Sequence, residues 1–364
     1  MIKRVEINLG QGNLNYGFDV GIELKDGASR QSLISKLEPA PKVIQCYEKW
    51  RIFNQEKREQ LLNQDVNNKQ IKVIINDIIA VKPSLQFQEL KDAIDDWLYI
   101  SKTFSEREKQ LRTALGGEDK IMVVISTQDD LTWRLPWHLW SFFDHYRNAG
   151  VVLSHPEFRN VNSNNNNFCY PKVLAIVDKK EDRSDLELWA ERKNIDLNIL
   201  SGDAFSDEEV KQKIAEKLDE QSWNILFFAG HSSSEGIFIK PGVPVTIFEL
   251  ENSLTKAIER GLQLAIFNSC DGLQIARDLL KINLPKVVVM REEVTNKVAK
   301  EFLKYFLEEF IENKGTPAFL AVQRASLSLR LLESRFPGAS LLPVMCSNPA
   351  TEPLVISCPD EERY

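Results

Sequence analysis

From Lys120 onward the sequence alternates between short apolar runs and amphipathic stretches, and this alternation constrains the fold more than any other feature. Unbroken apolar runs are typical of strands that a parallel sheet buries on both faces. The stretches between them carry apolar residues at helical spacing. We expect strands near 120–126, 172–177, 197–200, 223–229, 263–268 and 286–290, and helices near 134–143, 183–192, 206–219, 247–260, 272–282, 295–312 and 316–334. The pattern predicts an α/β fold whose mainly parallel sheet has helices on both faces.

The amino-terminal part of the chain has a different pattern. It holds two segments that alternate apolar and polar residues, near 2–9 and 15–24, followed by helical stretches near 42–64 and 86–115. Two alternating segments around a glycine-containing turn predict a β-hairpin. We therefore expect a small α+β accessory unit (hairpin plus helices) over residues 1–117 and a separate α/β domain over residues 118–358.

Charge and hydropathy bound the location and the partners. A net charge of −7 with scattered basic residues argues against a general affinity for nucleic acid or for anionic membranes. No apolar run approaches the roughly 18 residues that a membrane-spanning helix needs, and the amino terminus lacks the apolar core of a secretory signal. We expect a cytoplasmic protein with no nucleic-acid partner and no membrane span in this chain.

The five cysteines are odd in number and far apart in the sequence: Cys46, Cys169, Cys270, Cys346 and Cys358. None of them forms a C-x-x-C pair, the usual spacing of metal ligands. The pattern therefore predicts no metal site, no cofactor and no disulfide framework, and it favours a reducing compartment.

Two expected strand ends carry the residues of a possible reaction. His231 follows the strand near 223–229, and Cys270 follows the strand near 263–268. In parallel sheets the carboxyl ends of strands meet at one edge, where functional groups gather. A helix start after Cys270 and a nearby histidine both favour a thiolate nucleophile, with His231 as general acid–base. Backbone N–H groups of Ser232 and Cys270 could form an oxyanion hole.

The residues around this pair resemble a known family. Phe227 to Ser232 (FFAGHS) and Phe267 to Gly272 (FNSCDG) resemble the two signature segments of the CHAT domain, a caspase-like cysteine peptidase domain of clan CD related to separase. Further similar segments lie at 134–137, 318–324 and 336–344, so the resemblance extends over about 120–350. It is strongest to the variant common in cyanobacteria, in which a unit like residues 1–115 precedes the domain, often within a longer signalling protein.

The resemblance implies a caspase-like fold and the activity of a cysteine endopeptidase. His231 and Cys270 would form the catalytic dyad, an acyl-enzyme would be the intermediate, and a protein or peptide would be the substrate. Members of this kind are often regulated, so a regulatory protein partner or a fused sensor domain is also implied.

The resemblance also bears on the substrate pocket. Separase-like members carry an aspartate after the strand that follows the cysteine helix, and it pairs with an arginine of the substrate. Asn296 occupies that position here and supplies no negative charge. Glu292 and Glu293 in the same loop, and Asp178 at the end of the strand near 172–177, are the other pocket candidates.

Two alternatives to an active peptidase follow from the same residues. Many members have glycine directly after the histidine, where this chain has Ser232. Together with Asn296, this favours a latent or non-catalytic interaction module as the second hypothesis. A nucleotide-binding regulator is a third, but no G-x-G-x-x-G or G-x-x-x-x-G-K-[ST] motif follows an expected strand.

Overall fold

A computed structural model describes residues 2–67, 84–158, 168–178, 195–233, 235–270 and 272–357, and between 178 and 195 only Arg183, Leu186, Glu187, Ala190 and Glu191. Its internal contacts divide the chain into two compact units. Unit 1 comprises Met1–Val151, Val294–Phe302 and Gln323–Leu342, and unit 2 comprises Val152–Glu293, Leu303–Val322 and Pro343–Tyr364. The expected domain boundary between residues 117 and 118 stays a prediction.

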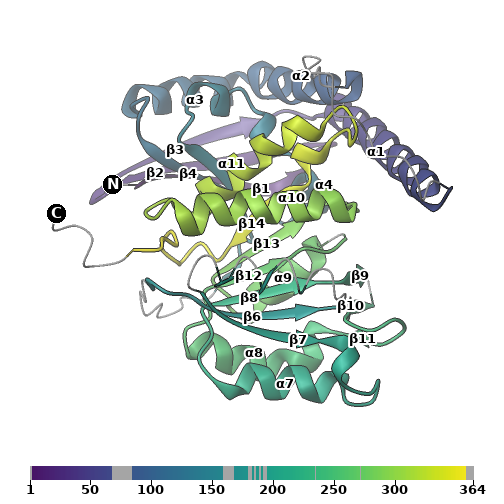
Figure 1. Ribbon diagram of the computed structural model, residues 1–364. Helices are drawn as coiled ribbons and strands as arrows, with labels where there is room; N and C mark the ends of the chain where they lie inside the picture. The colour runs from purple at the N-terminus through teal and green to yellow at the C-terminus, as the bar shows by residue number, and fades with distance from the viewer. Residues whose placement is uncertain are drawn as a thin grey trace. The chain divides into compact units, whose positions relative to one another are not determined.

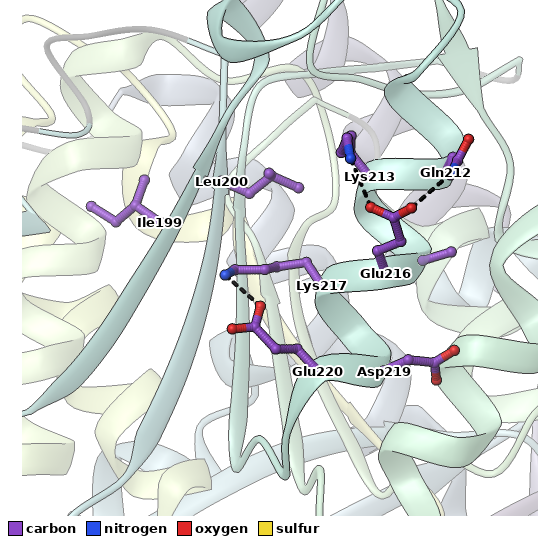
Figure 2. A pocket seen from close by; sticks show the side chains of 9 residues that line it. Ile199, Leu200, Gln212, Lys213, Glu216, Lys217, Asp219 and Glu220 are labelled. Atoms are coloured by element: carbon purple, nitrogen blue, oxygen red, sulfur yellow. Dashed lines mark hydrogen bonds and ion pairs between the residues drawn. The ribbon is translucent and has the colours of Figure 1, made fainter.

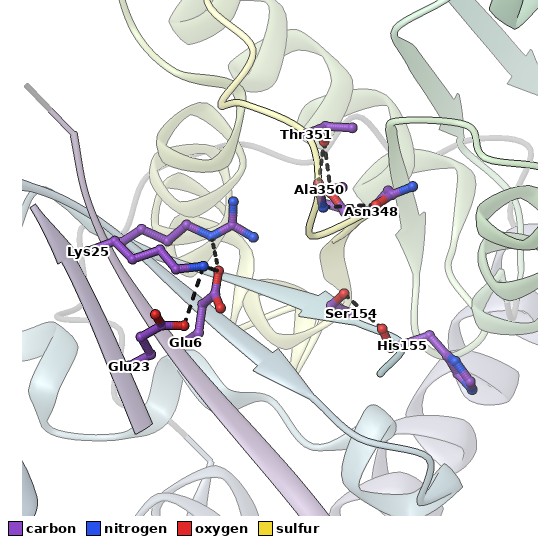
Figure 3. Close-up of polar contacts among 10 residues, drawn as sticks. Glu6, Glu23, Lys25, Ser154, His155, Asn348, Ala350 and Thr351 are labelled. Carbon is purple, nitrogen blue, oxygen red and sulfur yellow. Dashed lines mark hydrogen bonds and ion pairs between the residues drawn. The ribbon is translucent and has the colours of Figure 1, made fainter. Parts of the chain in front are cut away.

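Unit 1 begins with an antiparallel sheet. Its strands are β1 (Ile2–Asn13), β2 (Gly17–Asp26), β3 (Ser29–Leu37) and β4 (Lys120–Ser126), in the order β3-β2-β1-β4. Only the β1–β4 pair is parallel. The predicted hairpin is confirmed. Charged side chains also join its two strands: the Lys25 ammonium in β2 donates to the Glu6 carboxylate in β1 at 2.8 Å (Figure 3).

Three helices follow the hairpin in unit 1: α1 (Pro41–Asn67), α2 (Leu85–Ile100) and α3 (Lys102–Ala114). The prediction of one helix over 134–143 is wrong. That region holds three short elements: α4 (Asp130–Arg134), a 3-10 turn η1 (Trp137–Leu139) and α5 (Phe142–His145). Pro136 explains the break. A proline disfavours helical geometry in the residue before it, and Leu135 is extended with ψ of 134°.

Unit 2 contains the parallel sheet that the sequence predicts (Figure 1). Its strands run in the order β14-β13-β12-β8-β6-β7 and are β6 (Lys172–Val177), β7 (Asp196–Ser201), β8 (Ile225–Ala229), β12 (Leu264–Phe267), β13 (Lys286–Met290) and β14 (Pro343–Ser347). Only β14 runs antiparallel to its neighbour β13, and a further strand, β5 (Ala149–Ser154), pairs with β14. Every residue of β8, β12 and β13 is buried, as the apolar runs predict.

A small second sheet lies in unit 2 directly after β8. It has the order β11-β10-β9 and consists of β9 (His231–Ser233), β10 (Gly236–Phe238) and β11 (Pro244–Val245). The polar sequence of β9 gives no strand pattern, so this sheet was not predicted. It matters for function because its first residue is His231.

The remaining helices are α7 (Val210–Glu220), α8 (Ile247–Glu259), α9 (Leu273–Lys281), α10 (Asn296–Leu307), which continues as a π-helical turn η3 (Glu308–Glu312), and α11 (Ala318–Ser328). Three 3-10 turns accompany them: η2 (Gly202–Ala204), η4 (Leu329–Leu332) and η5 (Ala339–Leu341). The helix expected at 183–192 lies largely outside the described residues. The predicted α/β class, a mainly parallel sheet flanked by helices and preceded by an antiparallel unit, is confirmed.

Two local features support these assignments. Helix α8 starts at a capping box, in which the Thr246 hydroxyl accepts from the Glu249 amide and the Glu249 carboxylate accepts from the Thr246 amide. Past β14 the chain turns tightly, with the Thr351 hydroxyl donating to the Asn348 carbonyl at 2.8 Å (Figure 3). Among the described residues, no helix has both the length and the apolar character needed to span a bilayer.

Candidate active site

Three adjacent parallel strands, β6, β8 and β12, bring the candidate residues to one edge of the unit 2 sheet (Figure 1). Phe228 of β8 pairs with Phe267 of β12, and His231 and Cys270 each lie three positions beyond that pair. Asp178 follows Val177, the last residue of β6 to pair with β8. Because parallel strands point the same way, all three residues lie beyond the same carboxyl edge.

His231 is exposed and has an acidic neighbour. Its imidazole is 70% exposed, and Nε2 lies 3.9 Å from Oδ2 of Asp178, whose side chain is only 12% exposed. The Asp178 amide also donates to the Ala229 carbonyl at 3.0 Å, which holds Asp178 against β8. The Asp178 carboxylate is therefore the acidic group that faces the His231 imidazole at this edge.

Cys270 is partly exposed in the short connection between β12 and α9. The connection is fixed at both ends by backbone hydrogen bonds. Asn268 donates to the Phe228 carbonyl of β8 at 2.8 Å, and Gly272 donates to the Met290 carbonyl of β13 at 2.8 Å. Helix α9 begins directly after Gly272, so its amino-terminal end lies close in sequence to the thiol.

Two glycines let this edge pack closely. A Cβ on Gly230 would lie 2.6 Å from the Phe238 carbonyl oxygen, and a Cβ on Gly272 would lie 2.7 Å from Cβ of Val289. Neither glycine has a positive φ. Glycine is needed here for space, so the neighbouring strands can approach the backbone beside His231 and Cys270.

The side chain of Ser232 is a feature that the sequence did not reveal. Its hydroxyl donates to the backbone carbonyl of Cys270 and lies 2.9 Å from the Ser269 hydroxyl. The sequence suggested only the backbone amide of Ser232 as functional. The proximity of two loops nearly forty residues apart could be anticipated from the adjacent strands, but a side-chain contact between them could not.

The pocket candidates fall in different places. Glu292, half-buried, and Glu293, exposed, follow β13 beyond the same carboxyl edge as Cys270. Since Phe267 pairs with Val289, Glu292 and Cys270 lie equally far beyond the paired residues of their strands. Asn296 is the exposed first residue of α10 and belongs to unit 1, so its pocket role stays a prediction from the resemblance.

The other described cysteines differ from Cys270. Cys46 and Cys346 are free and buried. Burial raises the pKa of Cys346 to about 12, and the charges of Arg291 and Arg277 only partly oppose this rise. Cys169 is disulfide-bonded, a single bond that the cysteine pattern did not predict.

A second surface feature among the described residues lies at the far edge of the unit 2 sheet. An open hollow of about 830 Å³ lies between the edge strand β7 and helix α7, with Ile199 and Leu200 on one side (Figure 2). Both of its lysines form ion pairs with glutamates of the same lining, as in the Lys217–Glu220 pair at 2.5 Å. Within the described ranges, no cluster of three or more histidine, cysteine or acidic residues could hold a metal ion.

The parallel sheet and the residues at its carboxyl edge define a caspase-like α/β domain. The sequence profile of the CHAT domain family matches residues 147–336, more than half of the chain. The chain therefore belongs to the CHAT domain family. None of the curated proteins compared with it matches the sequence.

Two solved structures are similar to this chain. Two crystal structures of the Saccharomyces cerevisiae separase–securin complex contain a chain similar to this one at 11% sequence identity, with TM-scores of 0.50 for the 3.0 Å structure and 0.48 for the 2.6 Å structure. Each likeness covers 97% of this chain, which spans only 30% of the matched chain. At this identity the 3.0 Å structure indicates a shared fold and nothing about activity.

Proposed function

We propose that this chain is a caspase-like cysteine endopeptidase that cleaves a protein substrate in a regulated signalling process, with Cys270 as nucleophile and His231 as general acid–base. One observation carries the proposal. Adjacent parallel strands deliver a histidine and a cysteine equally far beyond the pair formed by Phe228 and Phe267. The range matched by the CHAT family model, residues 147–336, includes both residues.

In the proposed reaction the Cys270 thiolate attacks the carbonyl carbon of the scissile peptide bond, and the carbonyl electrons move to the oxygen. Backbone N–H groups of Ser232 and Cys270 donate to this oxyanion. His231 protonates the leaving amine as the C–N bond breaks, which leaves a thioester on Cys270. His231 then takes a proton from water, the resulting hydroxide attacks the thioester, and collapse of the intermediate releases the carboxylic acid and frees the thiolate.

Asp178 has two possible uses in this scheme. Its carboxylate lies 3.9 Å from His231 and would stabilise the imidazolium that donates the proton. With Glu292 and Glu293 it also makes this edge acidic, which suits a cationic side chain of the substrate. Asn296, if it lines the pocket, would offer hydrogen bonds without charge.

A regulatory protein partner is part of the proposal. One similar solved structure contains separase in complex with securin, which motivates the search for a protein partner of this chain. A latent or non-catalytic interaction module remains the competing function, favoured by Asn296 at the position where the resemblance implies an acid.

The first test compares the whole chain with its Cys270→Ala variant. We expect an electrophilic peptide ketone carrying a basic side chain to label Cys270, and proteome cleavage to fall at least about 10³-fold in Cys270→Ala. Labelled peptides and new amino termini would be identified by mass spectrometry. Unchanged cleavage by Cys270→Ala would refute the nucleophile. An absence of both labelling and cleavage, also in lysate that contains the natural partners, would favour the interaction module.

A further inference from the structure

Ser232 connects the strand that carries the histidine to the loop that carries the cysteine. It is the middle residue of β9, where it pairs with Ile237 of β10. His231 and Ser233 on either side are exposed, whereas Ser232 is half-buried. Successive side chains of a strand point to opposite faces. The Ser232 hydroxyl therefore points inward, away from the face on which His231 is exposed.

The hydroxyl of Ser232 has two partners in the cysteine loop. It lies 2.9 Å from the Ser269 hydroxyl and donates to the Cys270 carbonyl. A serine hydroxyl has one proton and two lone pairs. The Ser232 hydroxyl is the donor in both contacts, so its single proton serves either the Cys270 carbonyl or the Ser269 hydroxyl. Ser269 is 2% exposed, so this short chain of hydrogen bonds is largely shielded from water.

The cysteine loop is thereby fixed from three strands. Asn268 is bound to β8 and Gly272 to β13 through backbone hydrogen bonds of 2.8 Å each. Between these two points, at the nucleophile itself, the side chain of Ser232 in β9 holds the carbonyl of Cys270. A bond to that carbonyl fixes the peptide plane after Cys270, and with it the direction of the Cα–Cβ bond that carries the thiol.

We propose that Ser232 is a positioning residue, which holds Cys270 in the orientation that its thiolate needs to attack a carbonyl in line with His231 and the oxyanion donors. This inference rests on the proposed peptidase function. Ser232 would then act twice, through its amide on the oxyanion and through its hydroxyl on the nucleophile. A glycine at this position has no side chain and could not form this hydrogen bond to the Cys270 carbonyl.

The test measures kcat and KM separately for Ser232→Ala, Ser232→Thr and the matched control Ser233→Ala. Ser233 is exposed and its hydroxyl accepts from the Glu235 amide, so Ser233→Ala should behave as the wild type. We expect Ser232→Ala to lower kcat about tenfold with little change in KM, because a lost positioning bond weakens the transition state more than substrate binding. Ser232→Thr keeps the hydroxyl and should recover most of kcat.

A second readout needs no substrate. Alkylation of Cys270 by iodoacetamide should slow in Ser232→Ala but not in Ser233→Ala, at equal thermal unfolding temperatures. Should Ser232→Ala not fold, Ser232→Cys replaces it, since a thiol has similar shape but donates weakly, and kcat should again fall.

Wild-type kcat in Ser232→Ala, or in Ser232→Cys where that variant replaces it, would overturn the inference. The same holds if Ser232→Thr is no better than Ser232→Ala. The proposed peptidase function is tested separately, by the Cys270→Ala variant. If Cys270→Ala is inactive and the serine variants are fully active, only the positioning role is wrong. If Cys270→Ala still cleaves, the peptidase assignment itself is wrong.

Discussion

Cys270 and Cys346 lie in the same compact unit, yet the fold gives their thiols opposite properties. Cys346 is in the interior of β14, paired with Val287 and fully buried, and burial raises its pKa to about 12. Cys270 is partly exposed between the end of β12 and the start of α9, and β12 pairs with β8, the strand after which His231 follows. The difference teaches that the sheet interior keeps a thiol neutral, whereas the carboxyl edge offers partners that can activate it.

The strongest test of this contrast removes the proposed partner of Cys270. We expect His231→Ala to lower kcat for peptide cleavage about 10²- to 10⁴-fold, because the leaving amine loses its proton donor. Exposed His145, whose Nδ1 is paired with the Ser141 carbonyl, is the matched control, and His145→Ala should retain full activity. Steady-state kinetics on one peptide would measure both variants. If His231→Ala kept the wild-type kcat, His231 would not be the general acid–base that we propose for Cys270.

Alkylation compares the two thiols directly. A thiol with a pKa of about 12 is ionised to roughly one part in ten thousand at pH 8, and only the thiolate reacts. We therefore expect iodoacetamide to modify Cys270 at least about 100-fold faster than Cys346 in the folded protein, measured by mass spectrometry of the peptides. Unfolding in urea should remove the difference. Equal alkylation rates of Cys270 and Cys346 in the folded protein would show that the sheet edge and the sheet interior do not differ in thiol reactivity.

The smallest expected effect is on the free energy of unfolding, and we expect it from substitution of Cys346 alone. Cys346→Ala should cost about 1–2 kcal/mol through lost packing and leave cleavage within about twofold of the wild type. The folded pKa of Cys346 is raised, so the stability contributed by its neutral thiol is complete below about pH 9 and is lost as pH rises toward 12. Urea unfolding should show a steeper loss between pH 9 and 11 in the wild type than in Cys346→Ala. Parallel pH profiles would mean that the buried thiol does not resist ionisation.

Elements with strong local patterns could be predicted from the sequence. The apolar runs at β4, β6, β8, β12 and β13 predict buried strands because they are too short for buried helices and a parallel sheet buries both faces of a strand. The strand β3 escaped prediction since its polar residues lie at a sheet edge, where burial imposes no pattern. Over 134–143 the spacing of apolar residues predicted one helix, which was wrong because Pro136 interrupts helical geometry there.

The sequence by itself determined that a histidine and a cysteine follow neighbouring strands of a parallel sheet, because apolar runs and strand ends are local properties of the chain. Only the tertiary structure decided which side chains meet there. The Asp178–His231 approach and the bond from Ser232 to Cys270 join residues 53 and 38 positions apart, and they depend on strand register and on the path of β9. Such contacts are set by packing between elements, which no local pattern records.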